Sequence, residues 1–305
     1  MELLALALLL LLLSTQHSRL LWNLLDSCDV ILTSIDNCAS LAYHSPREVD
    51  NPRFKPPALW PPKGGLLFQD VFASMSVDQE PQLRNITFSV KPGTKIGVGS
   101  SQNGGKNFIV PLIFRSLHVH NGDIKIDDWD TQSLSLEDLR KSIGFVPTDP
   151  PVFKGSVRYN LDPIEKFTDE EIWAALETVS LKDYITELPG GLQSDDVYSF
   201  DRESRRLLSL AMMILNHFNI IVVEEPKVIS NTELLNAFTK VLDEDLSKTT
   251  RIVIGQRSDT LLSCDTVLLL NQGRIASLGT KAELEEGGCP HYGTLRRASR
   301  LVSSS

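Results

Sequence analysis

The chain has 305 residues, enough for one large or two small domains with a hydrophobic core. Its composition, 42% hydrophobic and 23% charged, is ordinary for a globular protein, and the net charge of -9 argues against a nucleic-acid-binding surface, which is normally basic. The four cysteines lack C-x-x-C spacing, which predicts neither structural disulfides nor a zinc site and favours a reducing cytosolic setting.

Residues 1–44 are predicted to form one long helix. Residues 3–13 are almost wholly apolar, but they follow the acidic Glu2 and are fewer than the ~20 apolar residues needed to cross a bilayer. Apolar residues then recur at helical spacing as far as Ile35. We interpret the segment as the cytosolic end of a membrane helix whose outer part is missing. A signal-like or simply buried helix is the alternative.

Residues 45–64 are predicted to be a linker, because six prolines in this stretch oppose both helix and central strand. Residues 65–305 then alternate strand-like and helix-like segments, which predicts an α/β domain with a mostly parallel sheet covered on both faces. The early strands suggest an additional antiparallel piece, and residues 167–216 a helical subdomain. One helix is predicted over 169–180, with Thr168 as its cap. The predicted strands are 66–72, 85–90, 95–99, 143–146, 220–224, 251–254 and 266–270.

Residues 100–107 (SSQNGGKN) stand between a predicted strand and the apolar helix 108–114, which is the setting of a Walker A loop, G-x-x-x-x-G-K-[ST]. Ser100 replaces the first glycine and Asn107 replaces the hydroxyl that binds Mg²⁺, for which a longer amide is a poor substitute. Lys106 could still reach the phosphates of ATP, and helix amides could still face an anion. The candidate phosphate-binding residues are Ser100, Asn103, Gly104, Gly105, Lys106 and Asn107.

A second interpretation of the same region is a dinucleotide fingerprint that begins at Gly97 and Gly99. Gln102 occupies the place of the third glycine, and no acidic residue ends the next strand at the right distance. The sequence therefore favours the phosphate loop over this alternative.

Residues 219–225 (NIIVVEE) are a buried-strand pattern that ends in two acids. Such a strand can deliver Glu224 as an acid associated with Mg²⁺ and Glu225 as a neighbouring general base. A solvated strand end with two acids is the plainer alternative. The lysine loop at 100–107 favours the functional interpretation.

Several segments between these landmarks carry a resemblance to a known family. They are residues 122–127 (GDIKID), 136–140 (LEDLR) and 145–163 (FVPTDPPVFKGSVRYNLDP), with the proline-rich 56–61 and residues 34–37 before them. In these segments the chain resembles the second nucleotide-binding domain of ATP-binding cassette (ABC) transporters of subfamily C, the multidrug-resistance-protein group. The resemblance implies a P-loop NTPase-like fold, ATP and Mg²⁺ as ligands, and work alongside other transporter domains or subunits, with the domain facing the cytoplasm.

The resemblance also assigns roles that this sequence departs from. The aromatic residue that stacks on adenine falls on Met75, and the glutamine that senses Mg²⁺ and water falls on Thr148. The first Walker B acid is Glu224, and Glu225 keeps the position of the catalytic base. The histidine that contacts the γ-phosphate falls on Gln256.

The family's signature motif, S-G-G-Q or S-V-G-Q, falls on Asp201, Arg202, Glu203 and Ser204. By the resemblance, this helix start holds the γ-phosphate bound to a partner domain. Asp201 is expected to cap the helix with its own carboxylate, and Glu203 replaces a glycine that lets the phosphate approach. Both substitutions place negative charge where an anion would bind.

Three functions remain open at this point. The first is a truncated, degenerate ATP-binding subunit with little or no hydrolysis. The second is a working half that hydrolyses ATP slowly through Glu225. The third is a non-hydrolysing module that docks onto another transporter's cassette. An error in the sequence or gene model is another explanation of the substituted motifs. Against it, the residues that form the fold are kept, whereas the residues at the catalytic and binding positions are substituted.

Overall fold

The computed structural model describes residues 2–45, 48, 50, 52–100, 104–226, 232–255, 257–287 and 292–293. The chain divides into two compact units, residues 1–50 and residues 51–305. Helix α1 (Glu2–His44) makes up nearly all of the first unit, and from Ser14 onward its side chains are mostly exposed. Among the described helices, none combines the length and apolar character that a bilayer crossing requires. Whether α1 is the end of a membrane helix therefore stays a prediction.

The second unit contains an antiparallel sheet in the order β2-β1-β4-β5. Its strands are β1 (Leu66–Ser74), β2 (Leu83–Val90), β4 (His118–Ile126) and the short β5 (Trp129–Asp130). Phe68 pairs with Phe88 across β1 and β2, and their rings stack with centroids 4.3 Å apart. The predicted antiparallel piece is confirmed, although β4 and β5 were not predicted.

A second sheet runs in the order β10-β9-β3-β8-β7-β6. Strands β9, β3, β8, β7 and β6 are parallel, and β10 joins β9 as an antiparallel hairpin. Buried β-branched and leucine side chains fill the central strands, which suits a sheet covered on both faces. The bounds are β3 (Lys95–Ser100), β6 (Gly144–Val146), β7 (Ile220–Glu224), β8 (Thr250–Ile254), β9 (Thr266–Asn271) and β10 (Arg274–Thr280).

Alternate residues of the parallel strands enter two separate cores, because successive side chains point to opposite faces of a sheet. Ile220 and Val222 of β7 join the core shared with the antiparallel sheet and α2 (Ile109–Ile113). Ile221 and Val223 join a second core with the helices that follow β6. The predicted α/β architecture with both faces covered is confirmed.

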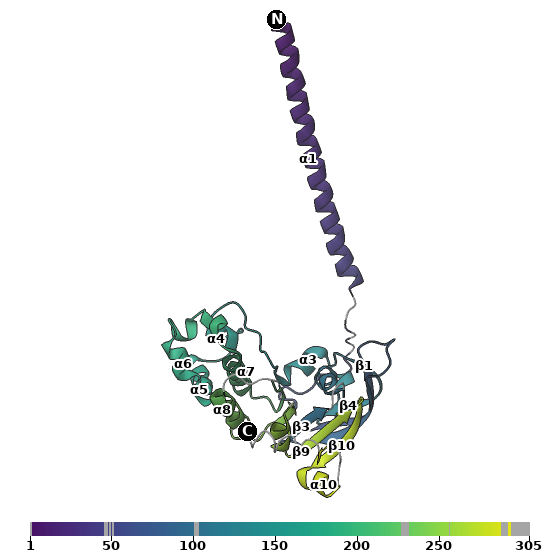
Figure 1. The fold of residues 1–305 in the computed structure, drawn as a ribbon, viewed down its shortest axis with the longest axis vertical. Helices are drawn as coiled ribbons and strands as arrows, with labels where there is room; N and C mark the ends of the chain where they lie inside the picture. Colours follow the sequence, from purple (N-terminus) through teal and green to yellow (C-terminus); the bar gives the residue numbers. More distant parts are fainter. Residues whose placement is uncertain are drawn as a thin grey trace. The chain divides into compact units, whose positions relative to one another are not determined.

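Figure 1 shows helices α4 to α8 gathered together, away from strands β1, β4, β9 and β10. Helix α5 (Asp169–Thr178) begins with a capping box made by Thr168 and Glu171, which confirms Thr168 as its cap. The other helices are α3 (Leu136–Lys141), α4 (Val157–Leu161), α6 (Lys182–Glu187), α7 (Arg202–Asn216), α8 (Thr232–Asp243), α9 (Ser258–Leu262) and α10 (Lys281–Glu286).

The proline-rich residues 52–64 form neither helix nor strand, yet they belong to the second unit. Trp60 is buried, and the Asp127 carboxylate accepts hydrogen bonds from the backbone N–H groups of Lys63, Gly64 and Gly65 at 2.7–2.8 Å. The charged acceptor satisfies three donors at once, so it fixes where the chain enters the domain.

Candidate nucleotide site

The candidate site lies at the carboxyl edge of the parallel sheet. Strands β3, β6, β7 and β8 are parallel, so the segments that follow them meet at one edge. This edge receives the loop after β3, Thr148 after β6, Glu224 and Glu225 at the end of β7, and Gly255 after β8. The fold therefore brings together side chains that are far apart in the sequence.

The described part of the phosphate loop is closely packed against the β9–β10 hairpin. Gly105 has φ 101°, a left-handed conformation that suits glycine, and a β-carbon there would lie 3.3 Å from the Cα of Gly273. The Gly273 N–H donates to the Gly104 carbonyl at 3.1 Å. Ser100, half-buried, ends β3, and Asn103 lies outside the described residues.

The glycines of the rejected dinucleotide pattern have a packing role. A β-carbon at Gly97 would lie 2.9 Å from the Cys264 sulfur, and one at Gly99 would lie 2.7 Å from Leu261. Their small size therefore admits α9 and the residues after it against β3.

Lys106 opens a short 3₁₀ turn (Lys106–Phe108) that leads into α2, where one longer helix over 108–114 was predicted. Pro111 lies in this region and cannot donate a backbone hydrogen bond. The half-buried Lys106 Nζ donates to the Gly255 carbonyl at 2.8 Å. A phosphate would have to compete with this internal acceptor.

The side chains expected to hold Mg²⁺ supply oxygen donors, the type that this ion prefers. Asn107 is exposed, and the half-buried Glu224 carboxylate receives the backbone N–H and hydroxyl of Thr148, both at 3.4 Å. Within the described residues there is no cluster of three or more His, Cys, Asp or Glu side chains that could hold a metal. Asn107 and Glu224 therefore fit Mg²⁺ only as two protein ligands beside phosphate oxygens and water.

Glu225 is buried, with a relative exposure of 6%. One carboxylate oxygen accepts from the Arg257 backbone N–H at 3.1 Å, and the other accepts from the Thr260 hydroxyl. Both oxygens are thus engaged within the protein, and a water molecule would have to compete with these two donors for the carboxylate. Gln256 lies outside the described residues.

Sequence reasoning missed a buried cation next to these acids. Arg206 on α7 is 3% exposed, donates to the Glu224 backbone carbonyl at 3.1 Å, and stacks over the Phe238 ring at 4.3 Å. Burial lowers the pKa of Arg206 to about 10, against the opposing attraction of Glu225 and Glu203. The contact of Arg206 with the end of β7 joins two different elements, so spacing along the sequence alone does not reveal it.

The signature-position residues lie at the start of α7, in the group of helices, whereas Lys106 and Thr148 lie at the sheet edge. The Asp201 carboxylate accepts from the Ser204 backbone N–H at 2.9 Å, which confirms it as the helix cap. Glu203 and Ser204 are both buried. The helix start is thus occupied by the protein's own carboxylate.

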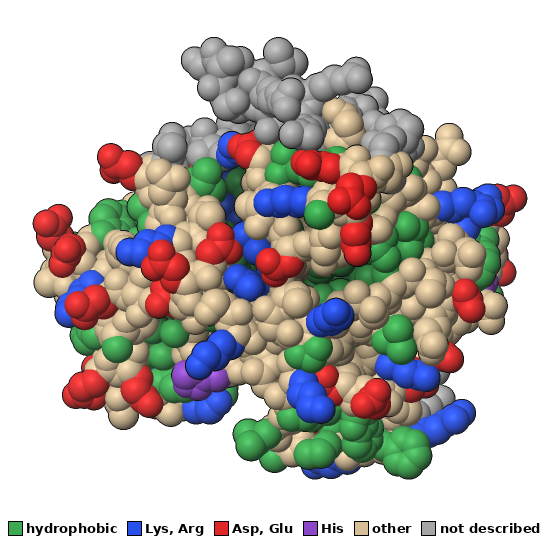
Figure 2. All heavy atoms as spheres, turned by 90° about the horizontal axis from the view of Figure 1, so that it is seen from below, with side chains coloured by type: hydrophobic (Ala, Val, Ile, Leu, Met, Phe, Trp, Pro, Cys, Tyr) green, Lys and Arg blue, Asp and Glu red, His purple; other side chains and the backbone are tan. Residues whose placement is uncertain are grey.

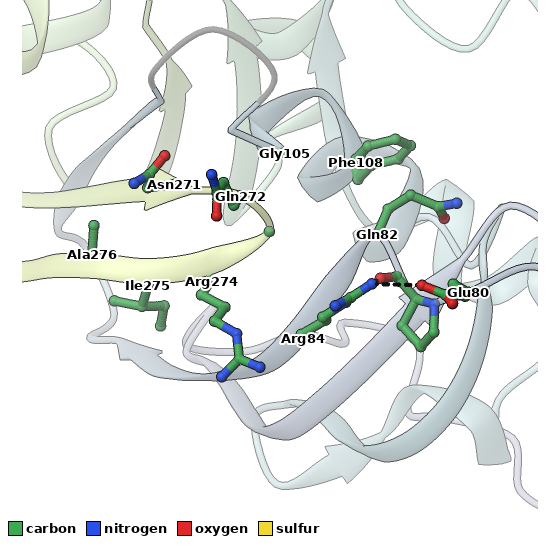
Figure 3. A pocket seen from close by; sticks show the side chains of 12 residues that line it. Glu80, Gln82, Arg84, Gly105, Phe108, Asn271, Gln272, Arg274, Ile275 and Ala276 are labelled. Atoms are coloured by element: carbon green, nitrogen blue, oxygen red, sulfur yellow. Dashed lines mark hydrogen bonds and ion pairs between the residues drawn. The ribbon is translucent and has the colours of Figure 1, made fainter.

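A hollow of about 670 Å³ adjoins the loop at Gly105. Figure 3 shows Phe108 and Gln82 on one side of it and the hairpin residue Arg274 on the other, with Arg84 paired to Glu80 at 3.0 Å. Met75, 66% exposed, does not line this hollow, but its backbone N–H donates to the Gln82 side chain at 3.1 Å. On the face drawn in Figure 2, acidic and basic side chains are interspersed.

Comparison with known proteins identifies a family to which this chain is similar. Residues 83–228 match the model of the ABC transporter family. The chain is 34% identical to ATP-binding cassette sub-family C member 2 of Rattus norvegicus over 75% of this chain and 15% of that protein. It is 33% identical to ABC transporter C family member 6 of Dictyostelium discoideum over 78% of this chain and 18% of that protein.

A solved bacterial Atm1-family ABC exporter with ATP bound matches the fold, with a TM-score of 0.76 and 23% identity over 86% of this chain and 46% of that chain. The fold and the sheet edge thus define a P-loop NTPase domain of the ABC type. The chain carries an ABC transporter domain, and this domain is a nucleotide-binding domain of subfamily C. It spans less than a fifth of the length of the two curated relatives named above.

Proposed function

We propose that this domain is a degenerate ATP-binding subunit of an ABC transporter, one that binds Mg-ATP weakly and hydrolyses it little or not at all. ABC transporter domains bind ATP with Mg²⁺, so the proposal concerns how much of that ability is left. The observation that carries it is the start of α7, where Asp201 caps the helix with its own carboxylate.

The charge at this helix start opposes a phosphate. A helix N-terminus attracts anions through its free N–H groups and its dipole, but Asp201 already satisfies one of these groups. A carboxylate about 4 Å from a phosphate charge costs up to ~4 kcal/mol at an effective dielectric of ~20. Glu203, two residues later, adds a second acid on the same turn. Both favour loss of the phosphate contact that the family places here.

The sheet edge supports the same proposal. Lys106 already donates to the Gly255 carbonyl, and Glu225 already accepts two hydrogen bonds from the protein. Removal of one electrostatic contact to a transition state commonly lowers the rate by ~10²–10³. Several such contacts are altered together here, although their effects do not simply add.

ATP affinity and turnover of the full chain test the proposal. We expect a dissociation constant for Mg-ATP in the millimolar range or weaker, and a change of less than two-fold in Lys106→Ala. Lys154→Ala, at an exposed lysine that is not among the predicted site residues, serves as the matched control. Micromolar binding that Lys106→Ala abolishes would contradict weak binding. Steady turnover that Glu225→Gln abolishes would instead establish a working ATPase.

We further propose that the chain works with other ABC transporter domains or subunits and that α1 attaches it to a membrane, with the domain on the cytoplasmic side. Two features support this proposal: the relatives are named as transporters, and α1 exposes apolar side chains such as Leu21, Leu25 and Ile31. A non-hydrolysing partner of another transporter's cassette is the alternative form of the same role.

Two measurements on the full chain test this second proposal. The wild type should float with phosphatidylcholine vesicles, and Leu21→Asp with Leu25→Asp should lower the floating fraction because charge opposes burial of α1. Pull-down with a full-length cassette transporter should recover the chain in the presence of ATP. Equal flotation of the wild type and the variant, together with no capture, would overturn it.

A further inference from the structure

Helix α1 carries a regular apolar seam in its second half. Between Leu21 and Ala42, apolar and small residues follow one another at spacings of three and four, in strict alternation. This is the spacing of the a and d positions of a heptad repeat, which turns one side of a helix towards a partner helix. The residues of this α1 seam are Leu21, Leu24, Cys28, Ile31, Ile35, Cys38 and Ala42.

The side of α1 opposite the seam is mostly polar, and its charges are acidic. It carries Asp26, Asp29 and Asp36, and no lysine or arginine occurs between residues 20 and 44. Helices that lie along a membrane by one face usually carry Lys and Arg on the other, because the headgroup surface is negative. The acidic side therefore favours a protein partner over a lipid surface for the seam.

The seam offers enough apolar surface for a stable pair of helices. Its large side chains, Leu21, Leu24, Ile31 and Ile35, are between 57% and 61% exposed. The large residues that flank it are also exposed: Leu20, Leu25, Leu32 and Leu41. At about 80 Å² each, these eight side chains would bury on the order of 600 Å² per copy. This approaches the ~800 Å² per partner that a specific interface commonly buries.

We propose that the α1 seam pairs with the same seam of a second copy of this chain, as a parallel two-stranded coiled coil. In such a homodimer each a or d residue faces its own equivalent. The parallel order rests on the proposed membrane attachment, which requires the leucine-rich starts of both helices to lie on the same side. The two roles are compatible, because flanking residues such as Leu25 lie outside the seam.

Two exposed cysteines make this pairing measurable. Cys28 occupies an a position and Cys38 a d position, and both side chains are exposed. In a parallel pair each cysteine lies opposite the same cysteine of the second copy. In an antiparallel pair, where a residues face d residues, Cys28 would instead lie opposite Cys38. A short crosslinker that reacts with thiols at both ends therefore reports both the pairing and its direction.

Crosslinking of the full chain with bismaleimidoethane tests the inference without a disruptive substitution. The wild type, Cys28→Ser and Cys38→Ser should each give a crosslinked dimer on a denaturing gel. Cys28→Ser combined with Cys38→Ser should give none, which controls for Cys264 and Cys289. Loss of the dimer in both single variants would contradict the parallel order. No dimer in the wild type, or a dimer that persists in the double variant, would overturn the inference.

Light scattering after size-exclusion chromatography tests the seam itself. The wild type should have about twice the chain mass of 33.9 kDa. Ile31→Asp with Ile35→Asp places charge in the seam and should raise the dimer dissociation constant by roughly 100-fold or more. Thr33→Asp with Asn37→Asp adds the same charge to the opposite side and should leave the dimer intact. Equal masses for the two variants would overturn the inference.

Failure of this inference can be told apart from failure of the proposed function. A monomeric wild type that gives no crosslink but floats with vesicles would overturn the pairing and leave membrane attachment standing. The affinity for Mg-ATP is measured separately and depends on neither result.

Discussion

Charged side chains make different contacts at the two ends of the parallel sheet. At the amino end, Lys95 of β3 donates to Asp243 at 2.7 Å, and Arg251 of β8 donates to the Leu242 carbonyl at 2.9 Å. At the carboxyl edge, Thr148 reaches Glu224 only at 3.4 Å, and Asn107 is exposed. The same strands carry both ends, so the difference does not come from the scaffold.

This difference indicates which charges serve the fold. The charges at the amino end have short contacts within the domain and need no ligand. The carboxyl edge holds the candidate nucleotide site, and here the predicted site residues Lys106 and Glu225 have hydrogen bonds within the protein. Substitutions at the amino end should therefore lower the free energy of unfolding, whereas substitutions among the predicted ligand-binding groups should change it little.

The largest effect is expected for Asp243→Ala at the amino end. Loss of the carboxylate leaves Lys95, with a side chain only 5% exposed, without its anion, and should lower the free energy of unfolding by about 3 kcal/mol. Urea denaturation measures this. Asp245→Ala, an exposed acid on the next turn, should change it by less than about 0.5 kcal/mol. Similar values for both variants would remove the contrast between the two ends.

A pH effect of about 2–3 kcal/mol is expected from Cys264, also at the amino end. Burial raises the pKa of this thiol from 9.0 to about 11, so the folded state holds the proton more tightly than the unfolded state. Its contribution is fully present below pH 9 and is lost as the pH rises towards 11. Unfolding free energies across this range should fall more steeply for the wild type than for Cys264→Ala, and parallel curves would contradict the assignment.

Asp127→Asn should lower the unfolding free energy by about 1–2 kcal/mol, because it weakens three hydrogen bonds to the entering chain. Asparagine tolerates the positive φ of 46° at this position, so the change removes the charge and one of the two acceptor oxygens without straining the backbone. Asp128→Asn, the exposed neighbour with φ 68°, is the control and should be close to neutral. If both variants lose the same unfolding free energy, the backbone conformation and not the Asp127 carboxylate is responsible for the loss.

The smallest effect is expected for Lys106→Met at the carboxyl edge. The half-buried side chain would lose one hydrogen bond to Gly255, so the unfolding free energy should change by less than about 1 kcal/mol in the absence of nucleotide. If Lys106→Met lowered the unfolding free energy as much as Asp243→Ala, Lys106 would stabilise the fold. The contrast between the two ends of the sheet would then not hold.

Much of the fold could be predicted from the sequence. The strand at 220–224 matches β7 residue for residue, and those at 95–99 and 266–270 differ from β3 and β9 by one residue. Runs of buried apolar residues are local signals, as is the cap at Thr168. β10 was not predicted, because its alternating exposure depends on pairing with β9. The hairpin turn against Gly105 was missed for the same reason.

The sequence by itself determined the α/β class, and it predicted where a phosphate loop, two acids and the substituted chemical positions lie. Those properties depend on residue type and short-range spacing. Only the tertiary structure decided that Arg206 donates to the Glu224 backbone carbonyl and that Lys106 donates to the Gly255 carbonyl. These contacts join residues 18 and 149 positions apart. No local propensity encodes them, because they exist only once parallel strands bring their carboxyl ends to one edge.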